Sequence, residues 1–144
     1  MQIKIDISSQ HLLGIINDVL DMSKIEAGKT VFKYSDFSIL DFVQELDTIF
    51  HSQIYEKQQT FTIIKENIQH EWVNGDQVHL MQIFSNLLSN AVKYTQKGGK
   101  IQFLVEECET KSSAYAKYHF AVIDNGVGMS EDFKDKIFDT FTRE

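Results

Sequence analysis

Apolar residues recur every three or four positions across residues 76–95, the spacing that the buried face of an α-helix produces. They occupy most of the circumference of this predicted helix: Leu80, Ile83, Phe84, Leu87, Leu88, Ala91 and Val92. A helix this apolar is expected to be buried. Asn86, Asn90 and Lys93 are spaced i, i+4 and i+7 and therefore share one face, and Tyr94 follows them. Buried amides need partners, which are either neighbouring backbone groups or a bound ligand.

The same period predicts three other helices. The first covers residues 8–27, extends back to about Lys4, and ends at Gly28. The second runs from Ile39 to about Lys57, after a possible capping residue at Asp36 or Ser38. A last helix begins after Ser130, which precedes two acidic residues and is a good N-cap.

Runs of β-branched and aromatic residues predict strands between these helices. The predicted strands cover residues 60–64, 72–73, 100–109 and 115–124, and residues 30–38 are extended. Gly98 and Gly99 form a hairpin-type turn, and Phe103, Val105, Phe120 and Val122 share one face of the last two strands. The order of elements predicts an α+β fold, a two-layer α/β sandwich with helices on one face of a mainly antiparallel sheet. A long N-terminal helix precedes it.

Composition limits the possible functions. The chain has 144 residues, 42% of them hydrophobic, which is enough for one core. A net charge of −7 with scattered acidic residues disfavours nucleic acid as a partner. No apolar run is long enough to span a membrane, and a single cysteine, Cys108, fits a reducing compartment. We therefore expect a cytoplasmic segment, whether or not a longer parent protein is anchored in a membrane.

A second motif follows a predicted strand: Asp124-Asn125-Gly126-Val127-Gly128-Met129. A carboxylate at a strand end, followed by two glycines that let the backbone approach a ligand, is typical of a nucleotide pocket. The competing interpretation is that Asp124 only forms a turn with the residues after it.

The two motifs together resemble the ATP-binding domain of sensor histidine kinases, which belong to the Bergerat-fold (GHKL) ATPase superfamily. Residues 86–95 are similar to the N box of this family, residues 124–129 to its first glycine box and residues 137–143 to its F box. The resemblance covers nearly the whole chain. It implies a Bergerat-type domain at residues 30–144 that is incomplete at the C-terminus, because the second glycine box, part of the lid over the phosphates, is absent.

The resemblance also implies roles for individual residues. Asp124 would accept a hydrogen bond from the exocyclic amine of adenine, and Asn90 would be the Mg²⁺ ligand. Asn86 would lie near the phosphates, and Lys93 would place its ammonium on one of them. The remaining residues implied in ATP binding are Tyr94, Gly126, Gly128 and Met129.

Position 86 separates activities within the superfamily. Members that hydrolyse ATP carry a glutamate there as the general base for water, whereas Asn86 cannot take a proton. The site is therefore expected to hold ATP and pass its γ-phosphoryl to a protein histidine, and thence to a response-regulator aspartate. The alternatives are a non-catalytic dimerisation or regulatory module, and a GHKL nucleotide-binding protein that is not a histidine kinase.

Residues 1–29 resemble the second helix of the dimerisation and phosphoacceptor hairpin of these kinases, which implies a homodimer through this helix. His11 lies in this segment, but its flanking residues do not match the phosphoacceptor pattern. We thus expect the phosphoacceptor, and with it any catalytic residue, to lie outside this chain, which is then a piece of a kinase. His79 replaces the arginine usual at its position, and the other histidines lack metal-ligand spacing.

Overall fold

The computed structural model describes residues 16–135 and divides the chain into two compact units, residues 1–33 and 34–144. In the first unit, residues 16–26 are helical. The turn that follows this helix contains Gly28, which has a φ of +66° and donates its N–H to the carbonyl of Ile25 at 3.1 Å. The predicted helix stop is therefore confirmed. The predicted start of the helix and His11 lie outside the described residues.

This helix carries large apolar side chains that are exposed. They are Ile16, Val19, Leu20, Met22 and Ile25, which form a stripe that winds around the helix because four of them recur every three residues. Leu20 is 54% exposed and Ile25 is 68% exposed. An apolar stripe of this kind is a candidate contact surface.

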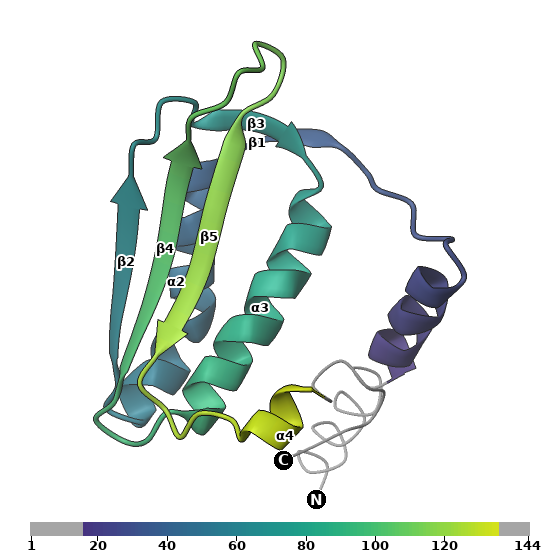
Figure 1. Cartoon of the computed structure of the whole chain (residues 1–144). Coiled ribbons are helices and arrows are strands. Elements are labelled where there is room, and N and C mark those ends of the chain that lie inside the picture. Colours follow the sequence, from purple (N-terminus) through teal and green to yellow (C-terminus); the bar gives the residue numbers. More distant parts are fainter. Residues whose placement is uncertain (1–15, 136–144) are drawn as a thin grey trace, which may run out of the picture. The chain divides into compact units, whose positions relative to one another are not determined.

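The second unit contains the rest of the described secondary structure (Figure 1). In chain order its elements are β1 (Ser35–Ser38), α2 (Ile39–Glu56), β2 (Thr60–Glu66), β3 (Trp72–Gly75), α3 (Gln77–Tyr94), β4 (Lys100–Cys108), β5 (Lys117–Asp124) and α4 (Glu131–Lys134). The predicted helices and strands of this region are thus present. Ser38 caps α2 by accepting the N–H of Asp41, and Ser130 caps α4 by accepting the N–H of Phe133.

The strands form two sheets where the sequence predicted one. β1 and β3 make an antiparallel pair, while the larger sheet has the order β2-β4-β5. In the larger sheet β2 and β4 are parallel and β4 and β5 are antiparallel. The prediction of mainly antiparallel pairing is therefore confirmed for two of the three described pairings, and the parallel pairing of β2 with β4 was not predicted. The reason is that α3 is the crossover that returns the chain to the sheet in the direction of β2. Gly98 and Gly99 consequently join α3 to β4 and do not form a hairpin turn.

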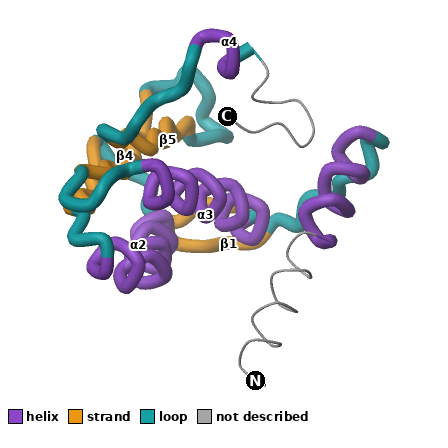
Figure 2. Tube along the Cα trace, turned by 90° about the horizontal axis from the view of Figure 1, so that it is seen from below, coloured by secondary structure: helices purple, strands orange, loops and turns teal. Residues whose placement is uncertain are grey.

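The core lies between the larger sheet and the two long helices. Figure 2 shows α2 and α3 side by side against the strands. On β4, Ile101, Phe103 and Val105 are fully buried and face the helices, with Val122 and Phe120 beside them on β5. From α3, the Phe84 ring packs on Phe103 and Phe120, with ring centroids 5.4 and 4.8 Å apart. The two-layer α/β sandwich is confirmed.

Candidate functional site

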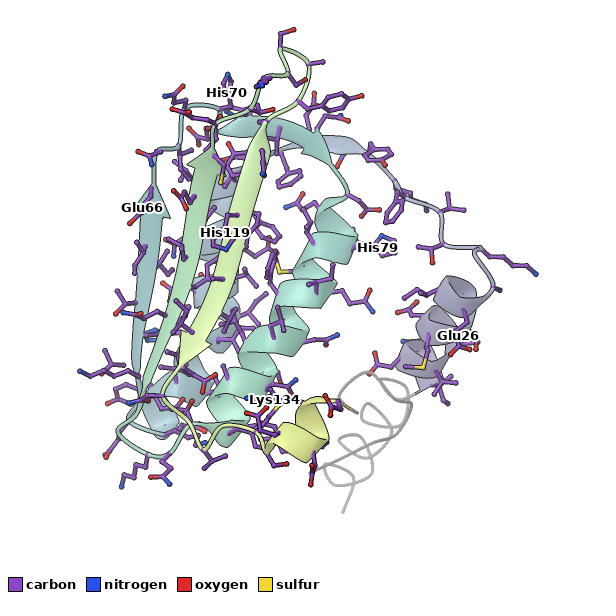
Figure 3. The ribbon with its side chains drawn as sticks, viewed as in Figure 1. Glu26, Glu66, His70, His79, His119 and Lys134 are labelled. Carbon is purple, nitrogen blue, oxygen red and sulfur yellow. The ribbon has the colours of Figure 1, made fainter. Side chains whose placement is uncertain are left out.

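The helix α3 begins at a buried carboxylate. Asp76 is the N-cap, and its Oδ1 accepts the N–H of His79 at 3.0 Å, while its Oδ2 lies 2.6 Å from Nδ1 of the same histidine. Figure 3 shows His79 at this end of α3. The imidazole of His79 therefore engages the capping carboxylate and helps to fix the first turn of the helix.

The two faces of α3 differ sharply in environment. Phe84, Leu88, Ala91 and Val92 are buried against the core. Asn86, Asn90, Lys93 and Tyr94 are exposed. The expectation of a helix buried nearly all round was wrong, because Ile83 is 51% exposed and Leu87 is 46% exposed. Burial therefore does not require a partner for the two amides, and α3 instead presents an open face that mixes amides with large apolar side chains.

The glycine motif rests on the last turn of this helix. The N–H of Val127 donates to the carbonyl oxygen of Tyr94 at 3.2 Å. A Cβ on Gly126 would lie only 2.6 Å from the same carbonyl oxygen, which is closer than real Cβ atoms approach backbone. Glycine at this position is therefore what permits the loop to pack on α3. The two motifs, separate in sequence, meet at the end of β5 and the end of α3.

Asp124 is the last residue of β5, and its side chain is exposed. Its Oδ1 accepts the N–H of Gly126 at 2.8 Å, which is the turn that the competing interpretation expected. A carboxylate has two oxygens with several acceptor positions, so this turn and the recognition of a ligand amine are compatible. The turn fixes the orientation of the carboxylate.

Asn125 anchors the loop from the other side. Its Oδ1 accepts the N–H of Lys100 at 2.7 Å, and its own N–H donates to the carbonyl of Lys100 at 3.1 Å. A Cβ on Gly99 would meet this Oδ1 at 3.0 Å and the methyl of Thr95 at 2.3 Å. Asn125 was part of the sequence motif, but its role in joining the glycine loop to the start of β4 was not predicted.

The other residues predicted to bind ATP lie on the exposed side of the junction between α3 and the glycine loop. The ammonium of Lys93 lies 5.2 Å from the centroid of the Tyr94 ring, a cation–π contact. Tyr94 and Met129 are 50% and 45% exposed. Gly128 has a φ of +74°, a conformation that favours glycine, and the space around it is open.

Lys57 and Gln59, two residues that sequence reasoning missed, hold the end of α3. The ammonium of Lys57 donates to the carbonyls of Val92 and Thr95 at 2.5 and 2.8 Å. The side-chain amide of Gln59 donates to the same two carbonyls at 3.1 and 2.8 Å. One indirect indication of such a cap was that no glycine directly follows Tyr94 to serve as the usual C-terminal cap of a helix.

A separate polar cluster lies at the end of the sheet away from α4, near the label of His70 in Figure 3. Glu107 accepts the backbone N–H groups of Gln69 and His70 at 2.7 and 2.8 Å, and its Oε1 lies 2.5 Å from Nδ1 of His70. The hydrogen bond from His70 is the main cause that lowers the pKa of Glu107 to about 2. Tyr118 donates its hydroxyl to the carbonyl of His70, and burial, with Glu107 nearby, raises the pKa of Tyr118 to about 12.

Two observations concern metals and membranes. Within residues 16–135, no group of three or more His, Cys, Asp or Glu side chains is arranged to hold a metal ion. Among the described helices, none combines the length and the apolar character needed to cross a bilayer.

The fold and this junction of an asparagine-bearing helix with a glycine loop define a nucleotide-binding α/β sandwich of the histidine kinase type. Residues 75–144 match the family described as histidine kinase-, DNA gyrase B-, and HSP90-like ATPase, and this part of the chain belongs to that family. It is 38% identical over 141 residues to hybrid signal transduction histidine kinase B of Dictyostelium discoideum. That match covers 96% of this chain but only 7% of the relative.

Solved structures of histidine kinases share this fold. Histidine kinase ThkA, in complex with the response regulator protein TrrA, superposes with a TM-score of 0.73 at 25% identity. The match covers 93% of this chain and 37% of that one. Full-length ShkA in complex with AMPPNP superposes with a TM-score of 0.68 at 24% identity, over 85% of this chain and 25% of that one.

Proposed function

We propose that residues 34–144 bind Mg-ATP as the nucleotide-binding part of a sensor histidine kinase. The observation that supports this proposal is the packing of the glycine loop on the last turn of α3, where the N–H of Val127 donates to the carbonyl of Tyr94. This contact brings Asp124 together with the turn that bears Asn90 and Lys93. The residue that recognises adenine and the residues that bind the phosphates and Mg²⁺ therefore lie together in one exposed region.

Adenine recognition is assigned to Asp124. Its carboxylate is oriented by the turn to Gly126 and accepts a hydrogen bond from the exocyclic amine of the base. A guanine would present a carbonyl oxygen at that point, and the two acceptors would repel each other. Gly126 and Gly128 let the loop approach the base, and Met129 and Tyr94 line the same side.

The phosphates and the metal ion are assigned to the exposed face of α3. The amide oxygen of Asn90 is a suitable ligand for Mg²⁺, a hard cation that keeps several waters and binds phosphate oxygens. When bound, Mg²⁺ would neutralise charge on the phosphates. Asn86 lies one turn earlier and donates hydrogen bonds near the phosphates, and Lys93 leaves Tyr94 to pair with one of them.

The activity of the whole protein is phosphoryl transfer from ATP to a histidine, followed by transfer to an aspartate of a response regulator. Asn86 supports transfer over hydrolysis, because an amide cannot act as the general base for water. The complex of ThkA with TrrA supports a response regulator as the partner. Since ATP and such regulators are cytoplasmic, we place this segment in the cytoplasm.

The proposal is tested by titration calorimetry of the 144-residue chain with Mg-ATP and Mg-GTP. We expect saturable binding of ATP and at least about hundredfold weaker binding of GTP, because a site built around one hydrogen bond rejects a base that cannot form it. Asp124→Asn should remove both the affinity and the preference. Equal affinity of the folded wild-type chain for the two nucleotides would refute the assignment of Asp124.

We also propose that the helix of residues 16–26 pairs with the same helix of a second copy. Its exposed apolar stripe supports this proposal, since Leu20 and Ile25 are more than half exposed. Leu20→Glu should convert a dimer to a monomer in analytical ultracentrifugation, whereas Glu26→Gln, also exposed, should not. A wild-type chain that sediments as a monomer at high micromolar concentration would contradict this proposal.

A further inference from the structure

The end of α3 is held from outside the helix. The last carbonyls of an α-helix have no partner within it, and here two side chains from the α2–β2 connection supply partners. Lys57 is the C-cap residue of α2, and its ammonium reaches the carbonyls of Val92, Lys93 and Thr95 at 2.5, 3.3 and 2.8 Å. Gln59 adds two hydrogen bonds to two of these carbonyls. We call Lys57 and Gln59 the clamp.

The clamp is fixed by its own surroundings. Gln59 is 8% exposed, and its backbone N–H donates to the carbonyl of Ile54 at 3.0 Å. The carbonyl of Lys57 accepts the N–H of Gly98 at 3.3 Å, in the connection that leads to β4. One residue that the clamp binds, Thr95, is only 1% exposed. The clamp therefore couples the position of α2 to the position of the last turn of α3.

The same turn carries the candidate nucleotide site on its other side. The carbonyl of Tyr94, which lies between two of the clamped carbonyls, accepts the N–H of Val127 from the glycine loop. Lys93 lies in this turn, and Asn90 directly precedes it. Any movement of this turn changes the spacing between the metal ligand on α3 and the loop that holds Asp124.

We propose that Lys57 and Gln59 are positioning residues for nucleotide binding, which act through the last turn of α3 without touching the nucleotide. This inference rests on the proposed function, and it assigns to the site two residues that lie outside both of its motifs. A clamp built from a charged donor on several carbonyls is strong, because hydrogen bonds with an ionised partner are about twice as strong as neutral ones. Without the clamp, the last turn of α3 frays and the glycine loop loses its backbone contact with Tyr94.

The experiment compares three variants of the 144-residue chain. Lys57→Met keeps the length and the apolar stem but removes the donors, while Lys57→Arg keeps the charge and the donors. Lys97→Met is the matched control, because it removes the same charge from an exposed residue close to the end of α3. Each variant is measured for its melting temperature, its Mg-ATP affinity at 15 °C, and the hydrogen-exchange rate of the Val127 amide by NMR.

We expect Lys57→Met to weaken Mg-ATP binding about tenfold, equivalent to about 1.4 kcal/mol, and to accelerate exchange at Val127 by a similar factor. Lys57→Arg and Lys97→Met should leave both within about threefold of the wild type. A lower melting temperature with unchanged affinity and unchanged exchange would reduce Lys57 to a helix cap and overturn the proposal.

Two further outcomes are also decisive. If Lys57→Met does not fold, Gln59→Met replaces it, since this variant loses only two neutral hydrogen bonds and should show the same changes at smaller size. If the wild-type chain binds no Mg-ATP, the proposed function fails, and the exchange at Val127 alone decides the inference: acceleration in Lys57→Met supports the clamp, and no change overturns it.

Discussion

Replacing Glu107 by glutamine tests how the polar cluster at the far end of the sheet contributes to stability. The Glu107 carboxylate joins β4 to the β2–β3 connection through the backbone N–H groups of Gln69 and His70 and through the His70 ring. Glutamine keeps one acceptor oxygen and nearly the same volume but loses the charge. The variant therefore isolates the charge-assisted part of these contacts.

The magnitude follows from the pKa of Glu107, which falls from 4.5 to about 2 on folding. At 1.36 kcal/mol per pKa unit, this shift sets an upper limit of about 3 kcal/mol. The His70 side chain is 65% exposed, although that of Glu107 is only 9% exposed, so solvent screens their interaction. We expect Glu107→Gln to lower the free energy of unfolding at pH 6 by about 1–2 kcal/mol.

The sign of the pH dependence is fixed by the direction of the shift. A carboxylate whose pKa is depressed in the folded state contributes its full stability above the unfolded pKa of 4.5. That contribution is lost progressively as the pH falls from 4.5 to about 2. The difference in stability between the wild type and Glu107→Gln should thus be constant between pH 5 and 6 and should shrink below pH 4.5.

The assay is urea unfolding, followed by circular dichroism, at several pH values between 3 and 7. Glu109→Gln is the matched control, because Glu109 is an exposed glutamate two residues further on. A stability difference that stays the same from pH 6 to pH 3 would refute the reasoning. So would a loss no larger than that of the control.

Three further predictions concern α3 and the glycine loop. Asn90→Ala should abolish detectable Mg-ATP binding in calorimetry while the melting temperature stays within about 2 °C of the wild type. The control is Ser89→Ala, which should keep the affinity, because Ser89 is exposed on the same helix but points about 100° away from Asn90. Gly126→Ala should cost about 1–3 kcal/mol in urea unfolding and weaken ATP binding, because its Cβ would lie 2.6 Å from the carbonyl oxygen of Tyr94; a variant with native affinity would argue against this packing of the loop. Phe84→Ala should cost about 3–5 kcal/mol, since its ring joins α3 to Phe103 of the sheet, and a loss under 1 kcal/mol would contradict that packing.

Local patterns predicted the elements of this domain well. The helical period identified α3 almost to the residue, and serine side chains marked the starts of α2 and α4. The two site motifs were also recognisable, because each is a short run whose spacing has a physical meaning. Their meeting point was not predictable, since it depends on a backbone contact between Val127 and Tyr94.

The errors share one cause, which is that a single sequence does not reveal distant pairings. The parallel pairing of β2 with β4 and the separate β1–β3 pair depend on contacts between segments far apart in the chain. The clamp on α3 joins residues more than thirty positions apart. The helical period likewise placed Ile83 and Leu87 among the buried residues of α3, although both side chains are about half exposed.

The crossover position of α3 has a consequence for the kinetics of folding. β2 and β4 are parallel, so no tight turn can bring them together, and Thr60 reaches Lys100 only after the intervening chain has been organised. The entropy of closing that long loop must be overcome before the pairing yields any stability, which makes such a step slow. The helix that carries Asn86 and Asn90 is itself the bridge across this loop. The exposed face of α3 that we propose to bind the nucleotide and the buried face that packs on the sheet belong to the same helix, so the proposed site forms only once this pairing step is complete.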